Sequence, residues 1–277
     1  MNLVIQGLDV ETQDLKTLAK LTQANGIEQV RPNVFRLAHC TPHPDVPALC
    51  ERARLDFGYV PEGQKLDHMG LVVMDMDSTL ITIECIDEIA DMLGLKPQVA
   101  AITASAMRGE IEFAESLTRR VALLAGLEES ALQRVYDERL RLSPGAERLL
   151  ATLRAHGIRT LLVSGGFTFF TDRLKARLGL DYAAANTLEI VDGRLTGRLL
   201  GPILDAQGKA DWLNRVRAEL GLTKEQVVAI GDGANDLRML AAAGISVAYH
   251  AKPVVREKTT YAINYVGLDG VLEFFEY

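Results

Sequence analysis

Three short apolar runs, rich in β-branched residues, recur along the chain from residue 69 onward. They are 71–74, 160–163 and 227–230, and each is followed at once by an acidic or glycine-containing segment. Such runs between helical segments are typical of buried parallel strands. Because the ligand crevice of an open α/β sheet lies beyond the carboxyl ends of its strands, we expect the three following segments to meet at one site. A further buried strand is predicted at 245–248, and a β-hairpin at 188–199.

Helical periodicity dominates the roughly 80 residues between the first two strands, where a single crossover needs only ~12. Apolar residues recur there every three or four positions, in four successive stripes. The stripes are Ile86, Ile89, Ala90 and Leu93; Val99, Ile102 and Ala106; Phe113, Leu117, Val121 and Leu124; and Leu132, Val135 and Leu140. Long insertions in compact domains are commonly lids or binding elements, so we predict a helical-bundle cap at about 82–142.

Residues 1–66 are predicted to form a separate small α+β domain. A polar segment that contains Gly and Pro, 58–68, separates it from the rest of the chain. Its expected elements are a strand at 3–5, a helix near 15–22, one or two strands within 29–38 and a helix over 46–57. The predicted fold class is α/β: a Rossmann-like parallel sheet flanked by helices over 67–277, with the inserted cap and the N-terminal domain added to it.

Composition and charge mainly exclude classes of protein and of binding partner. The 277 residues are 48% hydrophobic and 24% charged, which is typical of a folded chain. No apolar run approaches the ~20 residues that span a bilayer, and the N-terminus lacks the basic segment of a secretory signal. The net charge of −7 argues against nucleic-acid or anionic-membrane partners. Three scattered cysteines indicate neither a disulfide framework nor a zinc site, so we expect a cytoplasmic protein.

The segment Asp75-Met76-Asp77-Ser78-Thr79 carries two carboxylates directly after the first buried strand. Burying charge is costly without partners, which favours a chemical role over a structural one. One carboxylate can be a nucleophile or metal ligand while its neighbour acts as an acid or base. A turn that caps the next helix is the structural alternative.

Weaker signals follow the other two strands. Gly231-Asp232-Gly233-Ala234-Asn235-Asp236 adds oxygen ligands of the kind that Mg²⁺ prefers, although a glycine-rich turn with a helix cap has the same pattern. Ser164-Gly165-Gly166 offers a hydroxyl and free N–H groups that can bind an anion, or it is a plain turn. Lys209, at the start of a predicted helix, taken alone is more typical of a solvated surface residue.

Together these parts are the ones that phosphoryl transfer requires, because positioning and charge stabilisation dominate that reaction. The P-loop pattern is absent, and no GxGxxG follows a predicted strand, so no nucleotide or dinucleotide fold is indicated. All five histidines lie away from the three strand ends, which argues against a Ser/His/Asp set.

The residues DxDST, Ser-Gly-Gly, a helical Lys and GDGAND together resemble the haloacid dehalogenase superfamily of aspartate-nucleophile phosphotransferases. The fuller match, MDMDSTLITIECIDEIAD with SGGF and GDGANDLRML, resembles its phosphoserine phosphatase family and covers about residues 70–277. The resemblance implies Mg²⁺-dependent hydrolysis of O-phospho-L-serine through an aspartyl phosphate, the last step of serine biosynthesis.

The resemblance also implies roles for the residues around the chemistry. Asp75 is the expected nucleophile and a Mg²⁺ ligand. Asp77 is the expected general acid and base, with its backbone carbonyl on the metal. Asp232 is expected to complete the set of protein ligands to the metal. Asp236 is expected to contact these ligands without binding the metal itself.

Further implied roles concern the phosphoryl group and the rest of the substrate. Ser164, the Gly165 N–H and Lys209 are expected to hold the phosphoryl group, and Asn235 to contact phosphate or the attacking water. In the cap, Glu84 is expected to receive the substrate ammonium and Arg120 the substrate carboxylate, for which a planar guanidinium is suited. Met107 and Phe113 match apolar lid positions of the family, although core packing explains them equally well. Arg120 on an apolar helix stripe could also be a snorkelling side chain.

Alternatives remain for the activity and for the N-terminal domain. The same chemistry could act on phosphohomoserine or phosphothreonine, or transfer the phosphoryl group to an alcohol. A rival from another class is a non-catalytic amino-acid sensor. The N-terminal β-α-β-β-α order resembles a shortened ACT-type regulatory domain. We expect this domain to mediate homodimerisation or to pack on the catalytic domain, in preference to binding an amino acid.

Overall fold

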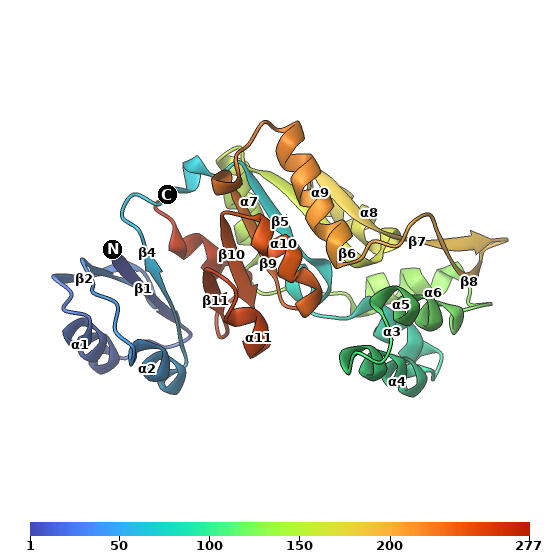
Figure 1. Ribbon diagram of the computed structural model, residues 1–277, viewed down its shortest axis with the longest axis horizontal. Helices are drawn as coiled ribbons and strands as arrows, with labels where there is room; N and C mark the ends of the chain where they lie inside the picture. Colours follow the sequence, from blue (N-terminus) through green and yellow to red (C-terminus); the bar gives the residue numbers. More distant parts are fainter.

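The computed structural model describes residues 1–277 and begins with a small four-stranded antiparallel sheet. Its strands have the order β2-β3-β1-β4. They are β1 (Asn2–Gly7), β2 (Gly26–Arg31), β3 (Val34–Ala38) and β4 (Leu55–Val60). Two helices, α1 (Thr12–Leu21) and α2 (Val46–Ala53), pack on one face and enclose a core of their own. This unit lies at one end of the molecule (Figure 1).

The helix predicted over 46–57 is wrong at its C-terminal end. Helix α2 stops at Ala53, Arg54 adopts a left-handed backbone with φ of +55°, and strand β4 follows. Strand β4 pairs with β1 from Leu55 to Val60. Pairing of β4 with a distant strand therefore overrides the local apolar spacing that resembled a helix.

A seven-stranded sheet forms the centre of the molecule, in the order β11-β10-β9-β5-β6-β7-β8. All neighbouring pairs are parallel except the antiparallel β7–β8 hairpin. The strands are β5 (Leu71–Met74), β6 (Arg159–Phe167), β7 (Tyr182–Val191), β8 (Arg194–Leu200), β9 (Val227–Gly231), β10 (Ile245–Tyr249) and β11 (Tyr261–Ile263). The predicted strands at 71–74, 160–163, 227–230 and 245–248 and the hairpin are thus confirmed.

Helices cover both faces of this sheet, as its apolar runs predict. Along β5, Val72 and Met74 belong to one buried cluster, whereas Leu71 and Val73 belong to another on the opposite face. The flanking helices are α7 (Ala146–Ala155), α8 (Thr168–Leu178), α9 (Ala206–Glu219), α10 (Leu237–Ala242) and α11 (Pro253–Arg256). Shorter 3₁₀ or π turns occupy Leu66–His68, Met76–Leu80, Val135–Arg139, Lys224–Gln226, Ala234–Asp236 and Leu268–Phe274.

The insertion after β5 is helical, as predicted, and lies at the opposite end from the N-terminal unit (Figure 1). Its helices are α3 (Cys85–Met92), α4 (Lys96–Met107), α5 (Phe113–Ala122) and α6 (Glu129–Arg134). The β7–β8 hairpin contacts this cap through backbone bonds of Leu195, whose carbonyl accepts from Gly126 N–H and whose N–H donates to Leu127, both at 2.8 Å.

The N-terminal unit packs on the C-terminal part of the central domain, which confirms one of its expected roles. Val4 and Val60 belong to the main hydrophobic core. The buried Asp56 carboxylate accepts backbone N–H bonds from 264–266 at 2.6–3.0 Å, and Gln6 Nε2 donates to the Gly270 carbonyl at 3.1 Å. Homodimerisation stays a prediction. None of the helices combines the length and the apolar character that a membrane span requires.

Candidate active site

Asp75 lies directly after β5, at the carboxyl edge of the central sheet, and is 5% exposed. Its Oδ1 accepts a hydrogen bond from Met76 N–H at 2.7 Å and contacts Lys209 Nζ at 2.8 Å. Its backbone N–H donates to Ile230 of the neighbouring strand at 3.0 Å. Both bonds to the carboxylate use Oδ1, which leaves Oδ2 available for chemistry.

Lys209 joins two of the strand-end segments. It lies in the first turns of α9, is 1% exposed, and its Nζ contacts Asp236 Oδ1 at 2.7 Å as well as Asp75. Burial acts to lower the pKa of Lys209, but Asp236 and Asp75 outweigh it and raise that pKa. The ammonium is therefore held charged inside the protein, and the alternative of a solvated surface lysine is wrong.

Asp232 and Asp236 follow β9 on a turn that has almost no free space. The Asp236 Oδ2 accepts backbone N–H bonds from Asp232 at 3.2 Å and Gly233 at 3.0 Å. A Cβ at Gly231 would lie 2.6 Å from Asp236, so only glycine fits there. Thr79 Oγ1 donates to Asp232 Oδ1 at 3.0 Å and orients that carboxylate.

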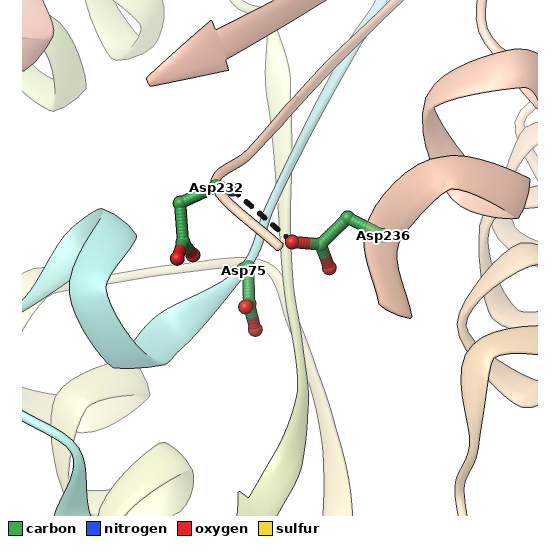
Figure 2. Close-up of side chains that lie close together, drawn as sticks. All are labelled: Asp75, Asp232 and Asp236. Atoms are coloured by element: carbon green, nitrogen blue, oxygen red, sulfur yellow. Dashed lines mark hydrogen bonds between the residues drawn. The ribbon is translucent and has the colours of Figure 1, made fainter. Parts of the chain in front are cut away.

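Asp75, Asp232 and Asp236 form an acidic cluster that could hold a metal ion (Figure 2). One carboxylate oxygen from each lies within 4.8 Å of the others. Burial and then Asp236 raise the pKa of Asp75 well above its usual range, with Lys209 opposing them, and the same two causes raise the pKa of Asp232 to about 7. A single lysine does not offset this charge, and hard oxygen donors of this kind suit Mg²⁺.

Asp77 lies beside the acidic cluster and has an environment suited to exchanging a proton. Burial, followed by the charge of Glu84, raises its pKa to about 7. Its Oδ1 accepts a long 3.4 Å hydrogen bond from Cys85 N–H. A carboxyl group whose pKa lies near neutrality can both donate and accept a proton under ordinary conditions.

The Ser164-Gly165-Gly166 segment interrupts the pairing of β6 with β7, between Val163 and Phe167. Gly166 N–H donates to Ser164 Oγ at 2.8 Å, and a Cβ at Gly166 would lie 3.0 Å from Asp77 Oδ2. The Ser164–Gly166 loop therefore lies against Asp77. Phe113 of the cap is close to Gly165, since a Cβ there would lie 3.1 Å from the ring.

These segments and the cap line one cavity of about 120 Å³. Its lining residues are Asp75, Asp77, Glu84, Ile86, Phe113, Leu117, Arg120, Ser164, Gly165, Gly166, Phe167, Asp232 and Asn235. Every predicted site residue lines this cavity except Met107, Lys209 and Asp236. Lys209 and Asp236 still belong to the site, because Lys209 Nζ contacts both Asp75 and Asp236. Met107 ends α4, is 65% exposed and does not line the cavity.

The two charged cap residues reach the cavity from different parts of the cap. Glu84 precedes α3, and its Oε1 accepts a hydrogen bond from Ser78 Oγ at 2.7 Å. Arg120, near the end of α5, is half-buried, and its Nε donates to the Ser116 carbonyl at 3.3 Å. Arg120 forms no ion pair, whereas its neighbour Arg119 pairs with Glu115 on the outer face. The Arg120 guanidinium is therefore available to an anionic ligand.

Two residues that position the site, Thr79 and Asn186, were not predicted from the sequence. Thr79 belongs to the DxDST segment, so its place in that motif was a usable signal. Asn186, on β7, is 3% exposed and contacts Gly165, and the sole hint in the sequence is a polar residue within the small apolar run of Tyr182–Leu188.

Comparison with known proteins agrees with this geometry. Residues 72–241 match the family model of the haloacid dehalogenase-like hydrolases, and residues 3–46 match a model described as a domain of unknown function. A HAD family hydrolase from Salmonella enterica serovar Typhi has a similar structure, with a TM-score of 0.90 and 36% identity over 99% of this chain and 98% of that one. The chain belongs to the haloacid dehalogenase-like hydrolases.

Relatives with more similar sequences identify the family within this class of hydrolases. A phosphoserine phosphatase from Polaromonas sp. is 54% identical over 214 residues, which is 76% of this chain and 91% of that protein. The structure of a probable phosphoserine phosphatase from Vibrio cholerae has a TM-score of 0.87 and 39% identity, covering 99% of this chain and 85% of that one. Within the haloacid dehalogenase-like hydrolases, the chain belongs to the phosphoserine phosphatase family.

Proposed function

We propose that this enzyme hydrolyses O-phospho-L-serine to L-serine and phosphate through an aspartyl-phosphate intermediate. The observation that carries the proposal is a single cavity with two kinds of lining. Asp75, Asp77 and the Ser164–Gly166 loop line it together with Glu84 and Arg120, which forms no ion pair. A phosphate ester with an ammonium and a carboxylate matches both groups of lining residues.

In the first step, Asp75 Oδ2 attacks phosphorus and the bond from phosphorus to the serine oxygen breaks. Asp77, in its protonated form, donates its proton to that oxygen, so L-serine leaves as the neutral alcohol. The pKa of Asp77, raised to about 7 by burial and by Glu84, keeps a protonated fraction present at neutral pH. The bonds from Met76 and Lys209 to Oδ1 fix the orientation of the nucleophile.

In the second step, a water molecule attacks the aspartyl phosphate and the bond from phosphorus to Asp75 breaks. The Asp77 carboxylate, left ionised by the first step, takes the proton of that water. Phosphate leaves, and both carboxyl groups return to their starting states. Asp77 therefore acts as an acid in the first step and as a base in the second, because the serine oxygen must gain a proton and the attacking water must lose one.

The phosphoryl oxygens need positive or N–H partners throughout. We assign them to Ser164 Oγ and the Gly165 N–H, with Asn235 also in the cavity lining, and to the Lys209 ammonium, whose Nζ contacts Asp75 Oδ1 at 2.8 Å. Asp75, Asp232 and the Asp77 carbonyl would hold Mg²⁺, and Asp236 would orient Asp232 through its backbone. When bound, Mg²⁺ supplies positive charge to the phosphoryl oxygens as negative charge builds up on them.

Release of phosphate from O-phospho-L-serine, with and without Mg²⁺, tests the proposal directly. We expect turnover with Mg²⁺ and almost none after chelation. Mg²⁺ should also raise the melting temperature, because it binds the folded state and relieves repulsion among the three carboxylates. An Asp232→Asn variant should lose most of that rise. Absence of turnover under both conditions would refute the proposed substrate.

Arg120→Ala should weaken recognition of the substrate carboxylate specifically. We expect KM for O-phospho-L-serine to rise by about 10-fold to 100-fold, since a bond to a charged group contributes ~1.5–3 kcal/mol. Hydrolysis of p-nitrophenyl phosphate, which has no carboxylate, should change little. Arg119→Ala is the matched control, because Arg119 pairs with Glu115 outside the cavity. Equal losses on both substrates would contradict the assignment of Arg120.

Other small phosphomonoesters are the second candidate, since the same catalytic groups would accept phosphothreonine or phosphohomoserine. The small volume of the cavity, about 120 Å³ with Phe113, Leu117 and the phosphoryl-binding loop in its lining, favours the smaller serine ester. Turnover across a panel of these esters separates the two possibilities. We further propose that the reaction is the last step of serine biosynthesis and takes place in the cytoplasm.

A further inference from the structure

Asn186 lies where the central sheet is interrupted next to the site. Between the pairs Val163–Ala184 and Phe167–Asn186, strand β6 advances four residues while β7 advances two. The extra residues of β6 fall within Ser164–Gly166, the loop to which the proposed function assigns the phosphoryl group. Such an irregularity leaves backbone groups without ladder partners, and buried ones must find others.

The Asn186 side chain supplies a partner for one of these groups, the Gly165 carbonyl, and also bonds to Leu204. Its Nδ2 donates to the Gly165 carbonyl at 2.9 Å, and its Oδ1 accepts from Leu204 N–H at 2.7 Å. The same Nδ2 lies 3.4 Å from the Leu204 carbonyl. One buried amide therefore joins the phosphoryl-binding loop to the chain that leads into α9.

Leu204 directly precedes the residue that caps helix α9. The next residue, Asp205, is its N-cap: Oδ1 accepts from Gly208 N–H at 2.8 Å, and the Asp205 carbonyl accepts from Lys209 N–H at 2.9 Å. Lys209 projects from this first turn to Asp75 and Asp236. A shift of Leu204 would therefore move Lys209 relative to Gly165.

We propose that Asn186 is a positioning residue that holds the phosphoryl-binding loop and Lys209 at a constant spacing. The inference rests on the proposed function. Asparagine suits the position because its amide donates on one side and accepts on the other, whereas a carboxylate only accepts and an alanine does neither. Nothing in the reaction itself requires Asn186, which contacts neither Asp75 nor Asp77.

Asn186→Asp and Asn186→Ala test this role. Asp keeps an acceptor for Leu204 N–H but places a second acceptor against the Gly165 carbonyl. We expect kcat/KM for O-phospho-L-serine to fall by about 10-fold to 100-fold in both variants, because small displacements in a positioned site are costly. The dissociation constant of inorganic phosphate, measured by calorimetry, should rise by about 10-fold.

Gln6→Leu is the matched control. Gln6 is 1% exposed and donates one amide bond to the Gly270 carbonyl, far from the site. The Gln6→Leu variant should lower the melting temperature without changing the affinity for phosphate. If the Asn186 variants do the same, with kcat/KM and phosphate affinity within about twofold of the parent, Asn186 is only structural and the proposal is wrong.

Two further outcomes separate this inference from the proposed function. Should Asn186→Ala fail to fold, Asn186→Asp decides, because it retains the shape of the side chain. A parent chain without turnover of O-phospho-L-serine, in which Asn186→Asp still weakens phosphate binding, would refute the substrate and support the positioning role. A parent chain that binds no phosphate would overturn both.

Discussion

Replacing Asp75 by Asn is expected to abolish turnover of O-phospho-L-serine while the fold stays intact. The amide cannot attack phosphorus, so kcat should fall by at least about 10⁴-fold, the scale seen when covalent enzymes lose a central catalytic residue. Burial and Asp236 raise the pKa of Asp75, which means that its charge is unfavourable in the metal-free chain. Removing that charge should leave the melting temperature equal to or above that of the parent.

The measurement is phosphate release together with thermal unfolding, both with the metal-free and the Mg²⁺-loaded chain. Asp192→Asn is the matched control: it makes the same chemical change at an exposed hairpin turn with φ of +50°, a conformation that Asn adopts readily. The control should equal the parent in both measurements. Retained turnover in Asp75→Asn would exclude the aspartyl-phosphate mechanism.

Replacing Lys209 by Met should damage both stability and catalysis. Lys209 is 1% exposed and its ammonium lies between Asp75 and Asp236. Without it, two carboxylates remain buried and unpaired, and such a loss costs about 3–5 kcal/mol of unfolding free energy. The phosphoryl group also loses a cation, so kcat/KM should fall by about 10²-fold to 10³-fold.

The double variant Lys209→Met with Asp236→Asn separates the two effects. It removes one of the stranded charges, so the unfolding free energy should recover in part, as measured by denaturant titration. Activity should not recover, because the cation is still absent. If Lys209→Met were as stable as the parent, the buried ion pairs of Lys209 would not stabilise the fold.

Mg²⁺ would act on the same balance of charge. The cluster of Asp75, Asp232 and Asp236 lies within 4.8 Å with only Lys209 to offset it. Stability of the metal-free chain should therefore fall as pH rises, since the raised pKa values of Asp75 and Asp232 mean that their protonated forms are favoured in the folded state. A bound cation would reverse that trend.

Much of the fold and site could be predicted because the signals are local. Strands β5, β6 and β9 are short apolar runs, and the residues that follow them must meet because parallel strands present their carboxyl ends at one edge. Helical stripes likewise predict the cap. Strand β4 could not be predicted, since its residues continue the spacing of α2 and become a strand only by pairing with β1.

By itself the sequence determined the strands that carry the site, the helical cap, the strand-end acids and the family, because periodicity, motif and spacing are properties of neighbouring residues. Only the tertiary structure decided that Lys209 is a buried cation between two carboxylates, that Met107 lies outside the cavity, and that Asn186 joins two loops. Each of these depends on which segments pack together. A contact between residues far apart in the chain, such as that of Asn186 with Gly165 or with Leu204, produces no periodic pattern in the sequence.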